Sequence, residues 1–136
     1  MAEQTIPQLM AAAIAATNAG RRAEARQWFE QVLKQKPGHA EALHRLGFIA
    51  MQEKRLSEAL DLIDRSIAID PNNALYHTNR GSVLLELKRV DEAVAAFGRS
   101  VELQPNQALL YSNLGQGLRR SGAMEEAIAA FSRAVE

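Results

Sequence analysis

Residues Arg65–Leu75 read RSIAIDPNNAL, and residues Arg99–Leu109 read RSVELQPNQAL. The second stretch repeats the first after 34 positions, and several further columns of residues keep the same step. The columns contain a proline, a glycine, a Glu-Ala pair and a large apolar residue: Pro37, Pro71 and Pro105; Gly47, Gly81 and Gly115; Glu24, Glu58, Glu92 and Glu126, each followed by Ala; Phe29, Ile63, Phe97 and Phe131. Self-similarity at one fixed period of this length indicates a repeat protein.

Each repeat contains two segments with apolar residues at helical spacing. In the third repeat we expect these helices at about 74–87 and 90–103. Pro105 ends the second helix, because proline lacks the amide hydrogen and restricts the residue before it. We expect Asn106 to cap the following helix. Gly81 and Ala93 are small enough to let the two helices of the repeat approach closely.

One repeat cannot bury its apolar surface alone, so neighbouring repeats must stack. The sequence therefore predicts an all-α fold, an α-α superhelix (solenoid) of four antiparallel helix-turn-helix repeats in a single domain. The expected repeat bounds are about 6–39, 40–73, 74–107 and 108–136. The first helix of each repeat should line a concave face.

The period and the order of residue types resemble the tetratricopeptide repeat (TPR), over residues 6–136. The closest match to its pattern lies in the last repeat, at Tyr111, Leu114, Gly115, Leu118, Ala127 and Phe131. This resemblance implies a module that binds a protein or peptide. It also admits the repeat region of a bacterial enzyme similar to O-linked N-acetylglucosamine transferase or to a TPR-containing sulfotransferase.

Composition narrows the function classes. Sixteen Lys and Arg balance sixteen Asp and Glu, which gives no reason to expect nucleic acid or an anionic membrane surface as a partner. The chain has no cysteine, and therefore no disulfide, thiolate nucleophile or Cys-type zinc site. No stretch has the pattern of a secretory signal or approaches the roughly 20 apolar residues of a membrane span, so we expect a cytoplasmic location and no membrane partner.

No combination of residues suggests catalysis. We expect the three histidines, His39, His44 and His77, to lie on the surface without a metal. Ser66 and Ser100 fall in a column of small packing residues, and the recurrent glutamate falls in the first helical turn, where a carboxylate favours the helix dipole. We therefore predict no metal, no cofactor and no enzymatic activity.

The candidate binding site is the groove implied by the family resemblance. Asn79 and Asn113 occupy the same groove position one repeat apart, similar to the asparagine ladder with which the O-linked N-acetylglucosamine transferase superhelix grips an extended polypeptide. An amide suits this role because it both donates and accepts hydrogen bonds. Solvated helix residues are the alternative interpretation. The predicted groove residues are Arg45, Phe48, Asn79, Ser82, Asn113, Gln116 and Arg119.

The chain ends at Glu136, before the register reaches a fourth proline and without the polar cap usual in repeat arrays. We interpret it as a fragment of a longer repeat protein, with a short natural protein as the alternative. Ile128 and Val135 repeat positions at which Leu60, Ile67, Val94 and Val101 should meet the next repeat. They form a predicted edge for weak self-association.

The leading hypothesis is a non-catalytic protein–protein interaction module. The alternatives are a substrate-recruiting region of a larger glycosyltransferase or sulfotransferase, and a self-assembly scaffold.

Overall fold

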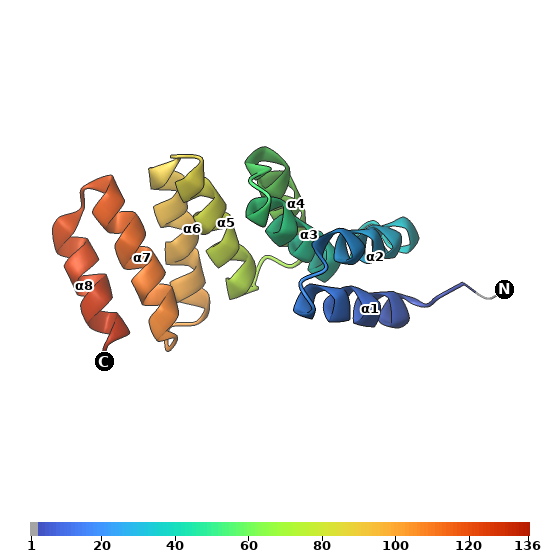
Figure 1. The fold of residues 1–136 in the computed structure, drawn as a ribbon. Helices are drawn as coiled ribbons and strands as arrows, with labels where there is room; N and C mark the ends of the chain where they lie inside the picture. The colour runs from blue at the N-terminus through green and yellow to red at the C-terminus, as the bar shows by residue number, and fades with distance from the viewer. Residues whose placement is uncertain (1–2) are drawn as a thin grey trace. The chain divides into compact units, whose positions relative to one another are not determined.

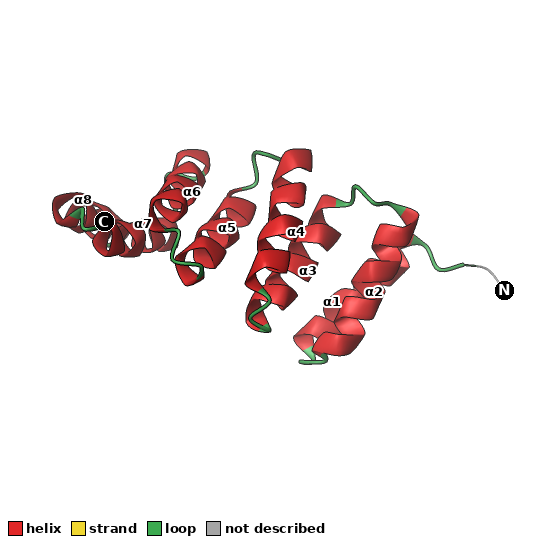
Figure 2. Cartoon of the chain, turned by 90° about the horizontal axis from the view of Figure 1, so that it is seen from above, coloured by secondary structure: helices red, strands yellow, loops and turns green. Residues whose placement is uncertain are grey.

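The computed structural model describes residues 3–136, which form eight helices and no strand (Figures 1 and 2). The chain divides into two compact units, of which unit 1 ends at Asp70 and unit 2 begins at Pro71. Unit 1 contains α1 (Ile6–Asn18), α2 (Arg22–Gln35), α3 (Ala40–Gln52) and α4 (Leu56–Ile69). Unit 2 contains α5 (Ala74–Glu86), α6 (Val90–Leu103), α7 (Ala108–Ser121) and α8 (Met124–Ala134).

Within each unit the helices pack in the order in which the chain makes them. In unit 1, α1 packs against α2, α2 against α3, and α3 against α4. In unit 2, α5 packs against α6, α6 against α7, and α7 against α8, while α5 also touches α7. The predicted all-helical fold of helix-turn-helix repeats is confirmed. The two helices predicted in the third repeat differ from α5 and α6 by a single residue, at the end of α5.

Close helix crossings explain the glycine column. A Cβ atom on Gly81 would lie 2.5 Å from Cε1 of Phe97, and one on Gly115 would lie 2.8 Å from the ring of Phe131. At Gly47 the corresponding atom would lie 2.8 Å from Cγ1 of Ile63. Because side-chain atoms do not approach this closely, the large apolar residue of each second helix occupies the space that glycine leaves.

The turn inside every pair has one conformation. The residues after the first helices are Gly20, Lys54, Lys88 and Gly122, and all four have positive φ angles, of 77°, 62°, 64° and 90°. The next residue in each turn donates its amide hydrogen back to the helix, as in the 2.9 Å bond from Arg89 N to the carbonyl oxygen of Leu84. This pattern is the Schellman motif, which satisfies carbonyl groups at a helix end.

The first helices differ in how they are capped. Asn73 caps α5, since its Oδ1 accepts hydrogen bonds from the amides of Leu75 and Tyr76 at 3.0 and 3.4 Å. The prediction that Asn106 caps α7 is wrong. The N-cap of α7 is Gln107, whose side chain makes no capping hydrogen bond. Asn106 lies one residue before the cap position, in the register of Asn72.

Candidate protein-interaction surface

The histidines have structural roles. His39 Nδ1 accepts a hydrogen bond from the amide of Ala42 at 3.1 Å and caps α3, and Nε2 of His77 lies 2.8 Å from the carbonyl oxygen of Pro71. The prediction that His44 lies on the surface is wrong, because its side chain is 6 % exposed. Its register position in α3 is that of Thr78 in α5, which is buried as well.

Burial also changes the chemistry of His44. Loss of water and, to a smaller extent, the charge of the neighbouring Arg45 lower its pKa to about 4, while Glu41 opposes the shift. The imidazole is therefore neutral at physiological pH and suits a packed interior. Across residues 3–136, no group of three or more His, Cys, Asp or Glu side chains is arranged to hold a metal ion.

The serine column is structural. Ser66 and Ser100 are fully buried, and their hydroxyls donate to the carbonyl oxygens of Ile63 and Phe97 at 2.6 and 2.7 Å. These hydrogen bonds lie within the helices that carry the serines. The structure thus places both hydroxyls in the packed interior, as the sequence predicts.

In the first three repeats the recurrent glutamate pairs with the arginine at the N-cap of the second helix. Arg89 donates to Glu92 through Nε and Nη2 at 2.9 and 2.7 Å, and this hydrogen bonding lowers the pKa of the Glu92 carboxyl. Arg55 and Glu58 form the equivalent pair in unit 1. In the last repeat Ala123 replaces the arginine. The structural interpretation of this column is supported by these contacts.

On unit 1 one of the two predicted groove residues, Arg45, pairs with its own helix. Nε of Arg45 donates to Glu41 Oε1 at 3.0 Å, one turn earlier on α3. Phe48 is half-buried, as is Met51 further along the same helix. Unit 1 therefore presents a paired cation and partly covered apolar side chains on α3.

Unit 2 presents a different surface. Asn79 on α5 and Asn113 on α7 are both half-buried and belong to helices that touch each other. Ser82 donates its hydroxyl to the carbonyl oxygen of Thr78 at 3.3 Å, while Gln116 and Arg119 are exposed on α7. The structure thus brings the two asparagines to corresponding places on neighbouring first helices.

Two residues of this surface were missed as candidates. Leu75 and Leu109 are 55 % and 69 % exposed, which makes them two of the six exposed large apolar residues among residues 3–136. Each precedes an asparagine by four positions, so Leu75 shares a helix face with Asn79, and Leu109 with Asn113. The available signal was the Leu-x3-Asn pattern, which occurs twice at the repeat period. We call Leu75, Asn79, Leu109 and Asn113 the Leu-Asn face.

The predicted edge lies at α8. Ile128 and Val135 are 62 % and 86 % exposed. Val94 on α6 packs against the buried cluster of Leu118, Ala127 and Ala130, which confirms that its register position meets the next repeat. Among residues 3–136, no helix combines the length and the apolar character needed to cross a membrane.

Comparisons with known proteins agree with this architecture. One profile described as tetratricopeptide repeat matches residues 16–80, and a second profile with the same description matches residues 78–136. The chain therefore belongs to the tetratricopeptide repeat family. Repeats of this kind indicate a protein-interaction module. A comparison with curated proteins gave no match.

Solved structures share the fold. A crystal structure of MamA superposes with a TM-score of 0.89 at 21 % identity, covering 96 % of this chain and 77 % of MamA. MamA from Desulfovibrio magneticus RS-1 gives 0.88 at 24 % identity, covering 96 % and 74 %. A mutant O-GlcNAc transferase from Thermobaculum terrenum gives 0.80 at 30 % identity, over 87 % of this chain and 23 % of the transferase chain. At their level of identity, the MamA structures establish the fold alone.

Proposed function

We propose that the Leu-Asn face of unit 2 binds an extended segment of a partner polypeptide, without catalysing a reaction on it. The observation that carries this proposal is the doubled pair of an exposed leucine and a half-buried asparagine on two touching helices. An amide side chain can donate to a peptide carbonyl and accept from a peptide N–H, so asparagine fits main-chain recognition. Exposed leucines add apolar contact for the ligand's side chains.

The spacing of the repeat suits an extended ligand. Packed helices lie roughly 8–10 Å apart, and an extended chain advances roughly 3.3 Å per residue. A ligand crossing from α5 to α7 therefore meets an equivalent point about every third residue. We expect aliphatic side chains at that spacing, with an acidic residue near Arg119. Ser82 and Gln116 extend the polar part of the surface, and a contribution from Arg45 and Phe48 on unit 1 stays a prediction.

The test uses peptides selected from a phage-displayed library of random dodecapeptides on the immobilised chain. The affinity of the best peptide is measured by fluorescence anisotropy for wild type and for Asn79→Ala/Asn113→Ala. Loss of two amide contacts should weaken binding roughly tenfold. The matched control is Asn72→Ala/Asn106→Ala, another asparagine pair at the repeat period but outside the Leu-Asn face, and it should change affinity less than about twofold. Equal losses in both variants, with helical circular dichroism intact, would sink the proposal.

A second candidate is a substrate-recruiting repeat region of a larger transferase. The 30 % identity to part of the Thermobaculum terrenum O-GlcNAc transferase supports it, as do the two asparagines. Sequencing the gene on both sides of this coding region distinguishes the two functions. A glycosyltransferase or sulfotransferase domain in the same reading frame supports recruitment, whereas stop codons on both sides remove it.

Self-association through α8 is a third proposal, supported by the exposure of Ile128 and Val135. Ile128→Lys/Val135→Lys should give a more monomeric sample in sedimentation velocity at high concentration. Glu126→Lys adds the same net charge elsewhere on α8 and should leave association unchanged. A wild-type chain that is monomeric under these conditions contradicts the proposal.

A further inference from the structure

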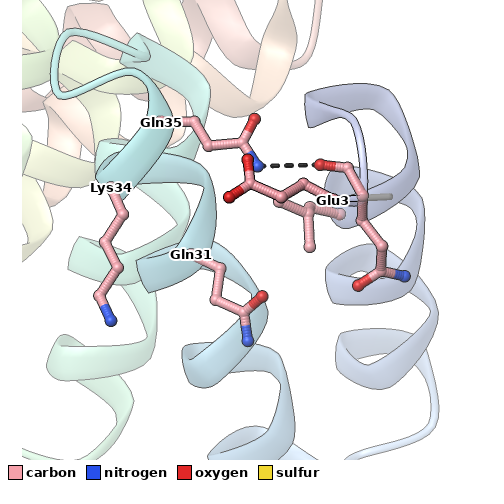
Figure 3. Close-up of a pocket in the computed structure, with 6 residues that line it drawn as sticks. Glu3, Gln31, Lys34 and Gln35 are labelled. Atoms are coloured by element: carbon pink, nitrogen blue, oxygen red, sulfur yellow. Dashed lines mark hydrogen bonds between the residues drawn. The ribbon is translucent and has the colours of Figure 1, made fainter. Parts of the chain in front are cut away.

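A pocket of about 360 Å³ lies in unit 1, between the extended segment before α1 and the last two turns of α2 (Figure 3). We call it the first crevice. Its walls are long polar side chains, and the buried Leu9 forms its apolar base. Nε2 of Gln35 donates to the carbonyl oxygen of Gln4 at 2.8 Å and ties the two walls together. The lining residues are Glu3, Gln4, Leu9, Gln31, Lys34 and Gln35.

The same crevice occurs three repeats later, within unit 2. There a pocket of about 170 Å³ lies between the loop before α7 and the end of α8. It is lined by Pro105, Asn106, Ala108, Tyr111, Arg133 and Glu136. Five of these residues occupy the register positions of Glu3, Gln4, Leu9, Gln31 and Lys34. The crevice is therefore a feature of the repeat, and its chemistry depends on which residues fill it.

In the last two repeats this position contains its own ion pair. Arg133 Nη1 lies 3.3 Å from Glu136 Oε2, and the guanidinium lies 5.4 Å from the centre of the Tyr111 ring. Arg99 Nη1 lies 3.1 Å from Glu102 Oε2 in the same register. In both repeats the arginine forms an ion pair with a carboxylate of the same helix end.

The first crevice has no carboxylate at the register position of Glu102 and Glu136. Gln31 stands where the other repeats have arginine, and Lys34 stands where Glu102 and Glu136 stand. Within residues 3–136, the side chains of Gln31 and Lys34 make no hydrogen bond and no ion pair. The first crevice thus presents an ammonium group and an amide without an acceptor, beside an apolar base.

The second repeat shows the other way of filling this position. Ala68 and Ile69 replace Lys34 and Gln35 in the register. Gly38 has the register position of Gln4 in the wall of the first crevice. A Cβ atom on Gly38 would lie 3.8 Å from Cδ1 of Ile69, so an aliphatic side chain lies against this wall in the second repeat. At the register positions of Gln31 and Lys34 in the four repeats, Lys34 is the cation that forms no ion pair within residues 3–136.

We propose that the first crevice binds a carboxylate side chain of an acidic peptide. The ligand's carboxylate takes the place that Glu102 and Glu136 occupy in the later repeats and pairs with Lys34. The Gln31 amide holds the peptide group beside it, since it can both donate and accept. Glu3, whose side chain reaches from the N-terminal segment toward α2, is the internal competitor (Figure 3). This site is separate from the Leu-Asn face and does not depend on it.

The test is an NMR titration of the ¹⁵N-labelled chain with the peptide acetyl-Ser-Gly-Glu-Glu-Gly-Ser amide. Its counterpart with glutamine in place of glutamate serves as the ligand control. The side-chain amides of Gln31 and Gln35 should shift with the acidic peptide and remain in place with the neutral one. No shift at these amides up to millimolar peptide, or equal shifts with both peptides, would overturn the proposal.

Variants separate the site from general charge attraction. Lys34→Gln should weaken binding at least about fivefold, because it removes the charge-assisted contact. Lys36→Gln makes the same change two residues on, at an exposed position outside the lining, and should have less than about a twofold effect. Glu3→Gln should strengthen binding about twofold or more, by removing the competitor. Equal effects of Lys34→Gln and Lys36→Gln, or weaker binding by Glu3→Gln, would contradict the site. Asn79→Ala/Asn113→Ala should leave this titration unchanged.

Discussion

The helix crossings of unit 1 and unit 2 place different side chains against the same glycine position. In unit 1 Gly47 faces the aliphatic Ile63, whereas in unit 2 Gly81 faces the ring of Phe97. The α1–α2 pair uses Ala13 at the glycine position, buried in one cluster with Phe29. A methyl group is thus accommodated in one crossing, yet it would lie 2.5 Å from a ring atom in another. The space beside this register position therefore differs between the helix pairs.

The largest expected effect comes from adding bulk to the α5–α6 crossing. Gly81→Leu and Ala93→Leu should each lower the free energy of unfolding by about 3 kcal/mol, because Phe97 occupies the space beside Gly81 and Ala93 is fully buried. Urea unfolding followed by circular dichroism measures the loss. Glu92→Ala in the same helix is the control and should cost much less, since its carboxylate is exposed. A Glu92→Ala variant as damaged as the leucine variants would show that this crossing is not the tight point of unit 2.

The next effect concerns a buried histidine that unit 2 lacks. His44 stays neutral in the folded chain because burial lowers its pKa to about 4, while the unfolded chain takes up a proton near pH 6.5. Stability should therefore be unaffected above about pH 6.5, fall by roughly 2–3 kcal/mol as the pH decreases toward 4, and level off below that.

His44→Thr copies the residue of α5 into α3, where Thr78 donates its hydroxyl to the carbonyl oxygen of Ala74 at 2.9 Å. The variant should lose this part of the pH dependence. Chemical unfolding of both proteins between pH 7 and pH 4 gives the difference, so that contributions shared by the two, such as those of the carboxylates, cancel. If the free energies of unfolding of the two proteins change in parallel with pH, protonation of His44 does not destabilise the folded chain.

A smaller effect separates two glycines of unit 2. Gly98 lies inside α6, and apart from its chain neighbours and the backbone of its own helix no atom lies within 4 Å of the place of its Cβ. Gly98→Ala should therefore raise the free energy of unfolding by about 1 kcal/mol through helix propensity. The same change at Gly81 should lower it, because of the contact with Phe97. Thermal unfolding of both variants tests the opposite signs. Destabilisation by Gly98→Ala would mean that its place in α6 is more crowded than the structure shows.

The sequence predicted the features that depend on short-range spacing. The ends of α5 and α6 follow from apolar periodicity and Pro105, and the glycine column follows from the 34-residue period. Asn79 and Asn113 were placed on corresponding first-helix positions for the same reason. These signals recur along the helices and from repeat to repeat. A deviation at one residue therefore hardly changes the predicted fold.

Features that depend on individual side chains were harder to predict. The burial of His44 was missed because histidine is common on surfaces, and the cap of α7 was misplaced by one residue. The first crevice was not predicted either, since its lining joins residues on two segments about thirty positions apart. What distinguishes it is a substitution pattern among the repeats, with Gln31 and Lys34 in place of an arginine and a glutamate.

The smallest expected effect lies in the turns, where each unit has one glycine and one lysine at the same left-handed position. Lys54 and Lys88 have φ angles of 62° and 64°, at the register positions of Gly20 and Gly122. For a non-glycine residue this conformation costs roughly 1–2 kcal/mol of folding free energy. Glycine avoids this strain, but part of the gain is cancelled because glycine loses more conformational entropy on folding. Lys88→Gly and Lys54→Gly should therefore stabilise the chain by about 0.5 kcal/mol each, and Gly122→Lys should cost a similar amount. Lys36→Gly is the matched control, because Lys36 has a φ of −139° and gains nothing from glycine. Precise urea titrations should show stabilisation at Lys54 and Lys88 and none at Lys36. Stabilisation at all three positions would trace the effect to the removal of positive charge and leave the turn geometry without a measurable cost.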